Sequence, residues 1–74
     1  MKLKKNPKPQ YCKYGNIIET VYIDTRIGLH RIDGPAIVRY NRETKELLEE
    51  CYYVNGKEYD EFQYWVIIAA LLGV

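Results

Sequence analysis

Polar and hydrophobic positions alternate through the middle of the chain and give way to a continuous apolar run near the C-terminus. The first alternating segment is rich in β-branched and aromatic residues, and it places Ile17, Val21 and Ile23 on one face of an extended strand. The segments predicted to form strands are 17–25, 36–40, 46–54 and a short return at 57–59. We therefore expect a small antiparallel β-meander of three to four strands, with some irregularity over 46–50, where helical propensity is high.

Two turn-rich segments separate the predicted strands, and both contain residues that shape the backbone. Asp33, Gly34 and Pro35 supply in succession a side-chain acceptor, a permissive φ and a fixed φ. Between the last two strands, Asn-Gly is typical of a type I′ hairpin turn. We expect His30 and Asp33 to hydrogen-bond backbone groups and fix the path of the chain, rather than to pair as a general base and its orienting acid. The residues expected to shape the two turns are His30, Asp33, Gly34, Pro35, Asn55 and Gly56.

The apolar run predicts one C-terminal helix over residues 60–72, with Asp60 as a favourable N-cap and Gly73 where a C-cap belongs. At helical spacing its apolar residues fall into two stripes, one at 62, 65, 66, 69 and 72 and the other at 64, 67, 68 and 71. A helix lying on a small sheet buries only one stripe. The second stripe would be covered by self-association, by a partner protein or by a sheet that curls around the helix.

Two other interpretations of the apolar run are weaker. A buried strand over residues 65–69 is a minor alternative, because β-branched residues are frequent there. The run is shorter than the roughly twenty residues that span a bilayer, and it lacks the basic polar face of an amphipathic membrane anchor. We therefore expect no membrane attachment.

The length of 74 residues fits one domain with a thin core, because a chain this small buries only about 60% of its unfolded surface. Residues 1–13 hold five lysines and two prolines but no acidic residue, which predicts a basic, flexible N-terminal arm. Residues 14–74 then form a single α+β domain, in which a repeat-like sheet over 17–59 packs with the helix over 60–72.

Catalytic and metal-binding motifs are missing from the sequence. Cys12 and Cys51 lie far apart and are accompanied by a single histidine, so we expect no metal site. We expect a cytoplasmic protein with free thiols, although the sequence leaves a disulfide between the two cysteines open. The chain contains no serine, and its glycines form no phosphate-binding pattern. We therefore predict that the protein is not an enzyme and needs no cofactor.

Charge and tyrosine content suggest two candidate contact surfaces. Residues 1–42 carry nine basic and three acidic side chains, whereas residues 43–74 carry two basic and seven acidic ones. We expect the eight tyrosines to form cross-strand pairs, with a recognition face as the alternative. The candidate protein-binding residues are Glu46, Glu49, Glu50, Tyr52, Tyr64, Trp65 and Ile68. The candidate nucleic-acid-binding residues are Lys2, Lys4, Lys5, Lys8, Lys13, Tyr11 and Tyr14, of which the tyrosines would stack on bases.

Segment 30–36 reads His-Arg-Ile-Asp-Gly-Pro-Ala, and segment 52–57 reads Tyr-Tyr-Val-Asn-Gly-Lys. The pair resembles the His-Arg-x-Asp-Gly-Pro-Ala and Tyr-x-x-Asn-Gly-Lys repeats of many phage and giant-virus proteins, and distantly the MORN-type β-hairpin repeats. The resemblance covers residues 17–59 and implies a meander used as a scaffold or binding surface, without catalytic residues. In those proteins the Asn-Gly-Lys hairpin usually leads to another repeat, whereas here it leads to the helix, so the chain resembles a minimal array with a terminal cap.

We therefore expect a small, non-enzymatic protein-binding module of phage-like origin that acts by occupying the surface of a larger macromolecule. The suspected origin suggests a host defence protein as the class of target. In this interpretation the acidic half and the tyrosines make the contact, while the helix mediates docking or homo-oligomer assembly. One alternative is a nucleic-acid-binding accessory protein that uses the basic arm, and a second is a structural or homo-oligomeric scaffold.

Overall fold

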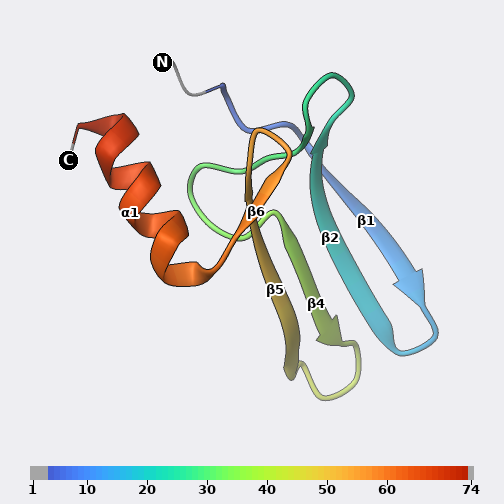
Figure 1. Ribbon diagram of the computed structural model, residues 1–74. Coiled ribbons are helices and arrows are strands. Elements are labelled where there is room, and N and C mark those ends of the chain that lie inside the picture. Colours follow the sequence, from blue (N-terminus) through green and yellow to red (C-terminus); the bar gives the residue numbers. More distant parts are fainter. Residues whose placement is uncertain (1–3, 74) are drawn as a thin grey trace.

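The protein folds as one antiparallel β-sheet with a single helix packed against one end of it (Figure 1). The computed structural model describes residues 4–73. The elements in chain order are β1 (Pro9–Tyr14), β2 (Ile17–Asp24), β3 (Gly28–Leu29), β4 (Ile37–Asn41), β5 (Leu47–Val54), β6 (Lys57–Tyr59) and α1 (Glu61–Leu72). The strands lie in the order β1-β2-β4-β5-β6, and the two-residue β3 pairs with β2 beside this path.

The predicted α+β class is therefore confirmed, but the predicted count of three to four strands is too low. The two additional strands are β1, which lies in the segment predicted to be an arm, and β3, which is too short to leave a sequence pattern. The irregularity expected near the start of β5 is present as a register shift: Arg39 pairs with Glu49 but Tyr40 pairs with Leu47, so Leu48 is an extra residue in β5.

The flexible N-terminal arm predicted over residues 1–13 is wrong for residues 9–13, because they belong to the edge strand β1. Pro9 is compatible with this strand, since a proline at the start of an edge strand removes no hydrogen bond that the sheet needs. A two-residue turn that includes Gly15, with its φ of 58°, then returns the chain into β2. Residues 1–3, which include Lys2, lie outside the described residues.

α1 begins and ends as its sequence predicts. The Asp60 side chain accepts a hydrogen bond from the backbone N–H of Gln63, and Gly73 adopts the left-handed conformation at the C-cap. The helix turns Tyr64 and Ile68 toward the sheet, where they form the core with Tyr52 and Val54 of β5. The stripe that contains residues 64, 67, 68 and 71 therefore faces inward.

Beyond this small core the molecule is thin. Its radius of gyration is 13.0 Å, against about 11 Å for an average globular domain of this length. Figure 1 shows the reason, since α1 lies against β5 and β6 while the β1–β2 and β4–β5 hairpins extend away from the helix. The sheet therefore has a helix-side face, covered by α1 only at the β5–β6 end, and an open face on its other side.

An ion-pair row crosses the open face of the sheet. Strand register places Cys12, Glu19, Arg39 and Glu49 side by side on adjacent strands. The Arg39 guanidinium forms ion pairs with the carboxylates of Glu19 and Glu49. Its hydrogen bond to Glu19 raises the pKa of Arg39. Glu19 is buried, so this pair satisfies a carboxylate that would otherwise be costly to desolvate.

Candidate functional site

The turn over residues 30–36 connects separate parts of the chain, and His30 is its fully buried polar residue. Its Nδ1 accepts a hydrogen bond from the backbone N–H of Asn55 at 3.0 Å, so Nε2 carries the proton and donates to the carbonyl of Lys4 at 2.9 Å. His30 therefore fixes the path of the chain, as the sequence predicts, by joining the N-terminal segment to the β5–β6 turn.

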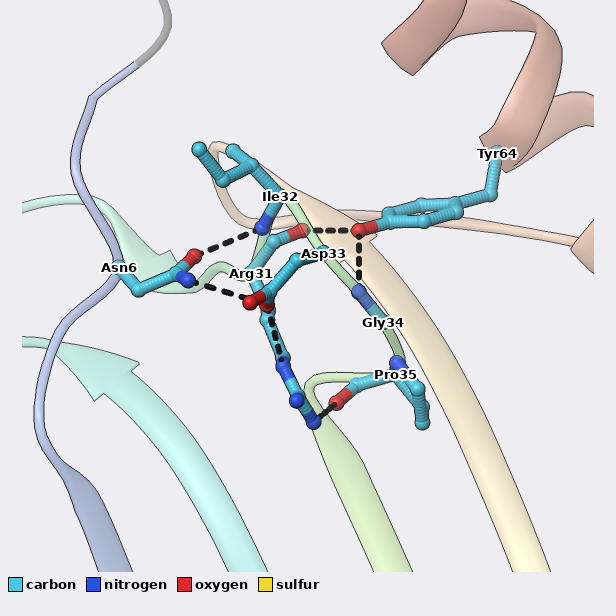
Figure 2. Close-up of polar contacts among 7 residues, drawn as sticks. All are labelled: Asn6, Arg31, Ile32, Asp33, Gly34, Pro35 and Tyr64. Atoms are coloured by element: carbon cyan, nitrogen blue, oxygen red, sulfur yellow. Dashed lines mark hydrogen bonds and ion pairs between the residues drawn. The ribbon is translucent and has the colours of Figure 1, made fainter.

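Arg31 and Asp33 make the second set of contacts in this turn (Figure 2). The guanidinium of Arg31 donates to Asp33 at 2.8 Å and to the carbonyl of Pro35 at 3.1 Å, and it lies 4.2 Å from the centre of the Tyr22 ring. The hydrogen bond from Arg31 lowers the pKa of Asp33. The Asp33 carboxylate is therefore held by the side chains of Arg31 and Asn6 and not, as predicted, by backbone groups. Asn6 closes the group from the N-terminal side, because it accepts from the Ile32 N–H and donates to Asp33.

The Asn-Gly turn between β5 and β6 is built to fit against this segment. Asn55 and Gly56 both have positive φ, as the type I′ prediction requires. The N–H of Gly56 donates to the carbonyl of Leu29, and a Cβ at Gly56 would lie 2.4 Å from the carbonyl oxygen of Ile27. The Asn-Gly turn thus packs on residues 27–29, which lead into the turn over residues 30–36, and the hydrogen bond between His30 and Asn55 joins the two motifs directly.

Tyr64 connects this turn to α1 (Figure 2). Its hydroxyl donates to the carbonyl of Arg31 and accepts from the N–H of Gly34 at 3.2 Å. Its ring is fully buried and packs against Tyr52 with ring centres 4.8 Å apart. Because the phenol is held at both its ring and its hydroxyl, the rotation of α1 about its own axis is fixed.

This fixed rotation leaves the other stripe of α1 in solvent. We call it the apolar face of α1, and it consists of Phe62, Trp65, Val66, Ala69 and Leu72. Phe62 is 79% exposed, Val66 53% and Leu72 51%. Two hollows flank Phe62 and Val66: one of about 300 Å³ lies between β6 and α1, and one of about 640 Å³ lies along Trp65 and Ala69.

The structure corrects several predicted protein-binding residues. Tyr52, Tyr64 and Ile68 are buried in the core and are not available for contact, whereas Trp65 is 43% exposed on the apolar face of α1. Phe62 and Val66 belong to one of the two predicted stripes, but they are not among the predicted contact residues. Helical periodicity could not have selected them, because it treats the two stripes alike, and the Tyr64 hydroxyl is satisfied by water as well as by a buried partner.

The predicted acidic contact surface is not a single surface. Glu46 lies in the turn before β5 and is exposed. Glu49 and Glu50 are consecutive in β5, so their side chains lie on opposite faces of the sheet. Glu49 is further engaged by Arg39, which leaves no shared acidic patch among these residues.

The predicted nucleic-acid-binding residues are also separated by the sheet. Tyr11 and Tyr14 are both exposed, but their positions in β1 place them on opposite faces, so they form no common stacking platform. Lys8 and Lys13 are exposed near them. Lys4 and Lys5 belong to the segment whose backbone His30 holds, and both side chains are exposed.

The two cysteines are free thiols in this fold. Cys12 lies in β1 and Cys51 in β5, with β2 and β4 between them, so three strand spacings of about 4.8 Å separate them. That distance is beyond the reach of a disulfide. Burial raises the pKa of the Cys51 thiol, which disfavours the nucleophilic thiolate. Within residues 4–73 no three side chains of metal-binding type lie together.

Comparison of the chain with protein-family models, with curated proteins and with solved structures finds no match. The resemblance to the His-Arg-x-Asp-Gly-Pro-Ala repeat proteins therefore stays a prediction. The helix among residues 4–73, α1, is not long and apolar enough to cross a membrane.

Proposed function

We propose that the protein is a non-enzymatic binding module that acts by occupying the surface of another protein chain with the apolar face of α1. The observation that carries the proposal is the exposure of four large apolar side chains on one face of one helix. Contiguous exposed apolar patches of this kind mark interaction sites far more often than scattered single residues do. Trp and Phe are also the side chains that dominate interface cores.

The surroundings of the apolar face of α1 suit the binding of apolar side chains from a partner. The two hollows beside Phe62 and Val66 would accept side chains from a partner, as ridges of one helix enter the grooves of another. Lys57, Glu58 and Glu61 lie at the edges of these hollows and would form a polar rim. The phage-like repeat motif adds an origin to the proposal: a phage-encoded inhibitor that blocks a surface of a host defence protein.

The experiment that tests the proposal compares three proteins as bait for partners from a host lysate, followed by calorimetry with the purified partner. The wild type and Leu47→Lys should bind equally, because Leu47 is 53% exposed but lies in β5 outside the apolar face. Phe62→Lys should weaken binding at least 10-fold, since it replaces the most exposed apolar side chain of the contact with a charge. A partner that binds all three proteins equally would contradict the proposal.

A further inference from the structure

We infer that a second copy of this chain covers the apolar face of α1, with the two helices packed antiparallel. The inference rests on the proposed function, because it names an occupant for the same face. A partner protein would then compete with the second copy, so the free protein is a weak, reversible dimer. Three properties of the described residues support this choice of occupant: the order of side-chain sizes, the position of charge and the area of the face.

Two copies of the apolar face fit together when their helices run in opposite directions, because a large side chain of one copy then meets a small one of the other. Phe62 is the largest exposed side chain near the start of α1, and Ala69 is the smallest member of the face, two helical turns later. An antiparallel pair can set each Phe62 against the Ala69 of the other copy and so fill the space over the alanine. A parallel pair would oppose Phe62 to itself and leave a gap between the alanines, which packs poorly.

The charges near α1 also favour the antiparallel arrangement. Glu58, Asp60 and Glu61 all lie at or just before the helix start, and the last turn of the helix carries no basic residue. A parallel pair would gather six carboxylates in one place. An antiparallel pair separates the two groups by the length of a twelve-residue helix, about 18 Å, which exceeds the Debye length at physiological salt, and it opposes the two helix dipoles favourably.

The area of the face matches a weak dimer. If each side chain has an area of about 200 Å², the middle of the range for aromatic residues, the exposed fractions of Phe62, Trp65, Val66 and Leu72 amount to about 450 Å² per copy. Two copies would bury at most about 900 Å² in total, which is just below the lower limit for a stable specific interface. We therefore expect dissociation in the micromolar range rather than a permanent dimer.

The first test is sedimentation equilibrium of the full chain from about 1 μM to about 1 mM, the range in which small interfaces associate. The apparent mass of the wild type should double across this range. Trp65 is the only tryptophan and lies on the face, so its emission should shift to shorter wavelength over the same concentrations. Leu47→Lys should behave as the wild type does, and Phe62→Lys should remain monomeric with an unchanged circular dichroism spectrum.

The second test examines the orientation of the two helices with opposite charges. Phe62→Lys and Ala69→Glu should each be monomeric alone, because each places two charges in the dimer. Mixed together, they should form a heterodimer, since one contact becomes a Lys–Glu pair and the other remains Phe against Ala. A parallel dimer gives no such rescue, so two monomeric variants that stay monomeric when mixed would overturn the antiparallel arrangement.

The outcomes separate this inference from the proposed function. A wild-type chain that stays monomeric at about 1 mM overturns the second copy as occupant, while Phe62-dependent binding of another protein at low concentration would still support the binding module. A dimer that persists in Phe62→Lys overturns the inference as well, because it must use another surface.

Discussion

Removing the hydroxyl of Tyr64 tests the connection between the turn and α1. In Tyr64→Phe the ring stays in the core, but the carbonyl of Arg31 and the N–H of Gly34 lose their partner. A buried polar group left unsatisfied costs about 1–3 kcal/mol, so two such groups cost about 2–6 kcal/mol. A water molecule that takes the place of the hydroxyl would lower this cost, and we expect a loss of about 2–3 kcal/mol in the free energy of unfolding.

That loss is large for this protein, because 74 residues at roughly 0.05–0.15 kcal/mol each correspond to a total stability of about 4–11 kcal/mol. Urea unfolding followed by circular dichroism and by Trp65 emission measures the difference. Tyr52→Phe is the matched control: its ring is buried beside Tyr64, but the structure shows no hydrogen bond from its hydroxyl to any described residue. Equal stability losses in the two variants would refute the anchoring role of Tyr64.

Three further substitutions test the turn over residues 30–36 and the Asn-Gly turn that packs beside it. Gly56→Ala should lose at least about 2 kcal/mol of stability, because Gly56 has a φ of 83° and a Cβ there would collide with a backbone carbonyl. Gly15→Ala is the control: Gly15 has a φ of 58° but open space around it, so the loss should be only about 1 kcal/mol. Thermal unfolding of the two variants measures the difference. His30→Leu should cost about 2–4 kcal/mol in urea unfolding, because it leaves two backbone groups unsatisfied; a loss below about 1 kcal/mol would contradict this. Arg31 lowers the pKa of Asp33, so this pair stabilises the fold above the unfolded carboxyl pKa of about 3.9 and the contribution disappears as pH falls through the lower folded value. Asp33→Asn should flatten that part of the stability-versus-pH curve, and an unchanged slope would show that the pair contributes nothing.

Much of the fold could be predicted because it depends on local patterns. The alternation in β2, the Asn-Gly turn and the capped apolar run specify their elements within a few residues. β1 is not predicted because lysines and prolines dominate residues 1–9, which lead into it, and the effect of a proline on an edge strand depends on the strand beside it. The pairing of Pro9–Tyr14 with β2 is a property of the assembled sheet, which no local pattern in residues 1–13 shows.

The candidate site was only half predictable. The two stripes of α1 follow from helical periodicity, but the sequence pattern alone does not say which one faces the sheet. That choice depends on the hydrogen bonds that Tyr64 makes with a turn thirty or more residues away. Likewise, His30 and Asn55 each carry a local turn signal, while the hydrogen bond between them is long-range.

Tyr64 turns the apolar face of α1 toward solvent, and we propose that a second chain covers it there. Nuclear magnetic resonance with a soluble paramagnetic probe measures both the exposure of this face and its covering, because the probe broadens signals from exposed side chains. In dilute protein, the signals of Phe62 and Val66 should broaden strongly while those of Tyr64 and Ile68 stay sharp, and at about 1 mM the Phe62 and Val66 signals should regain protection. Broadening of Tyr64 and Ile68, or protection of Phe62 in the dilute monomer, would contradict this arrangement of α1.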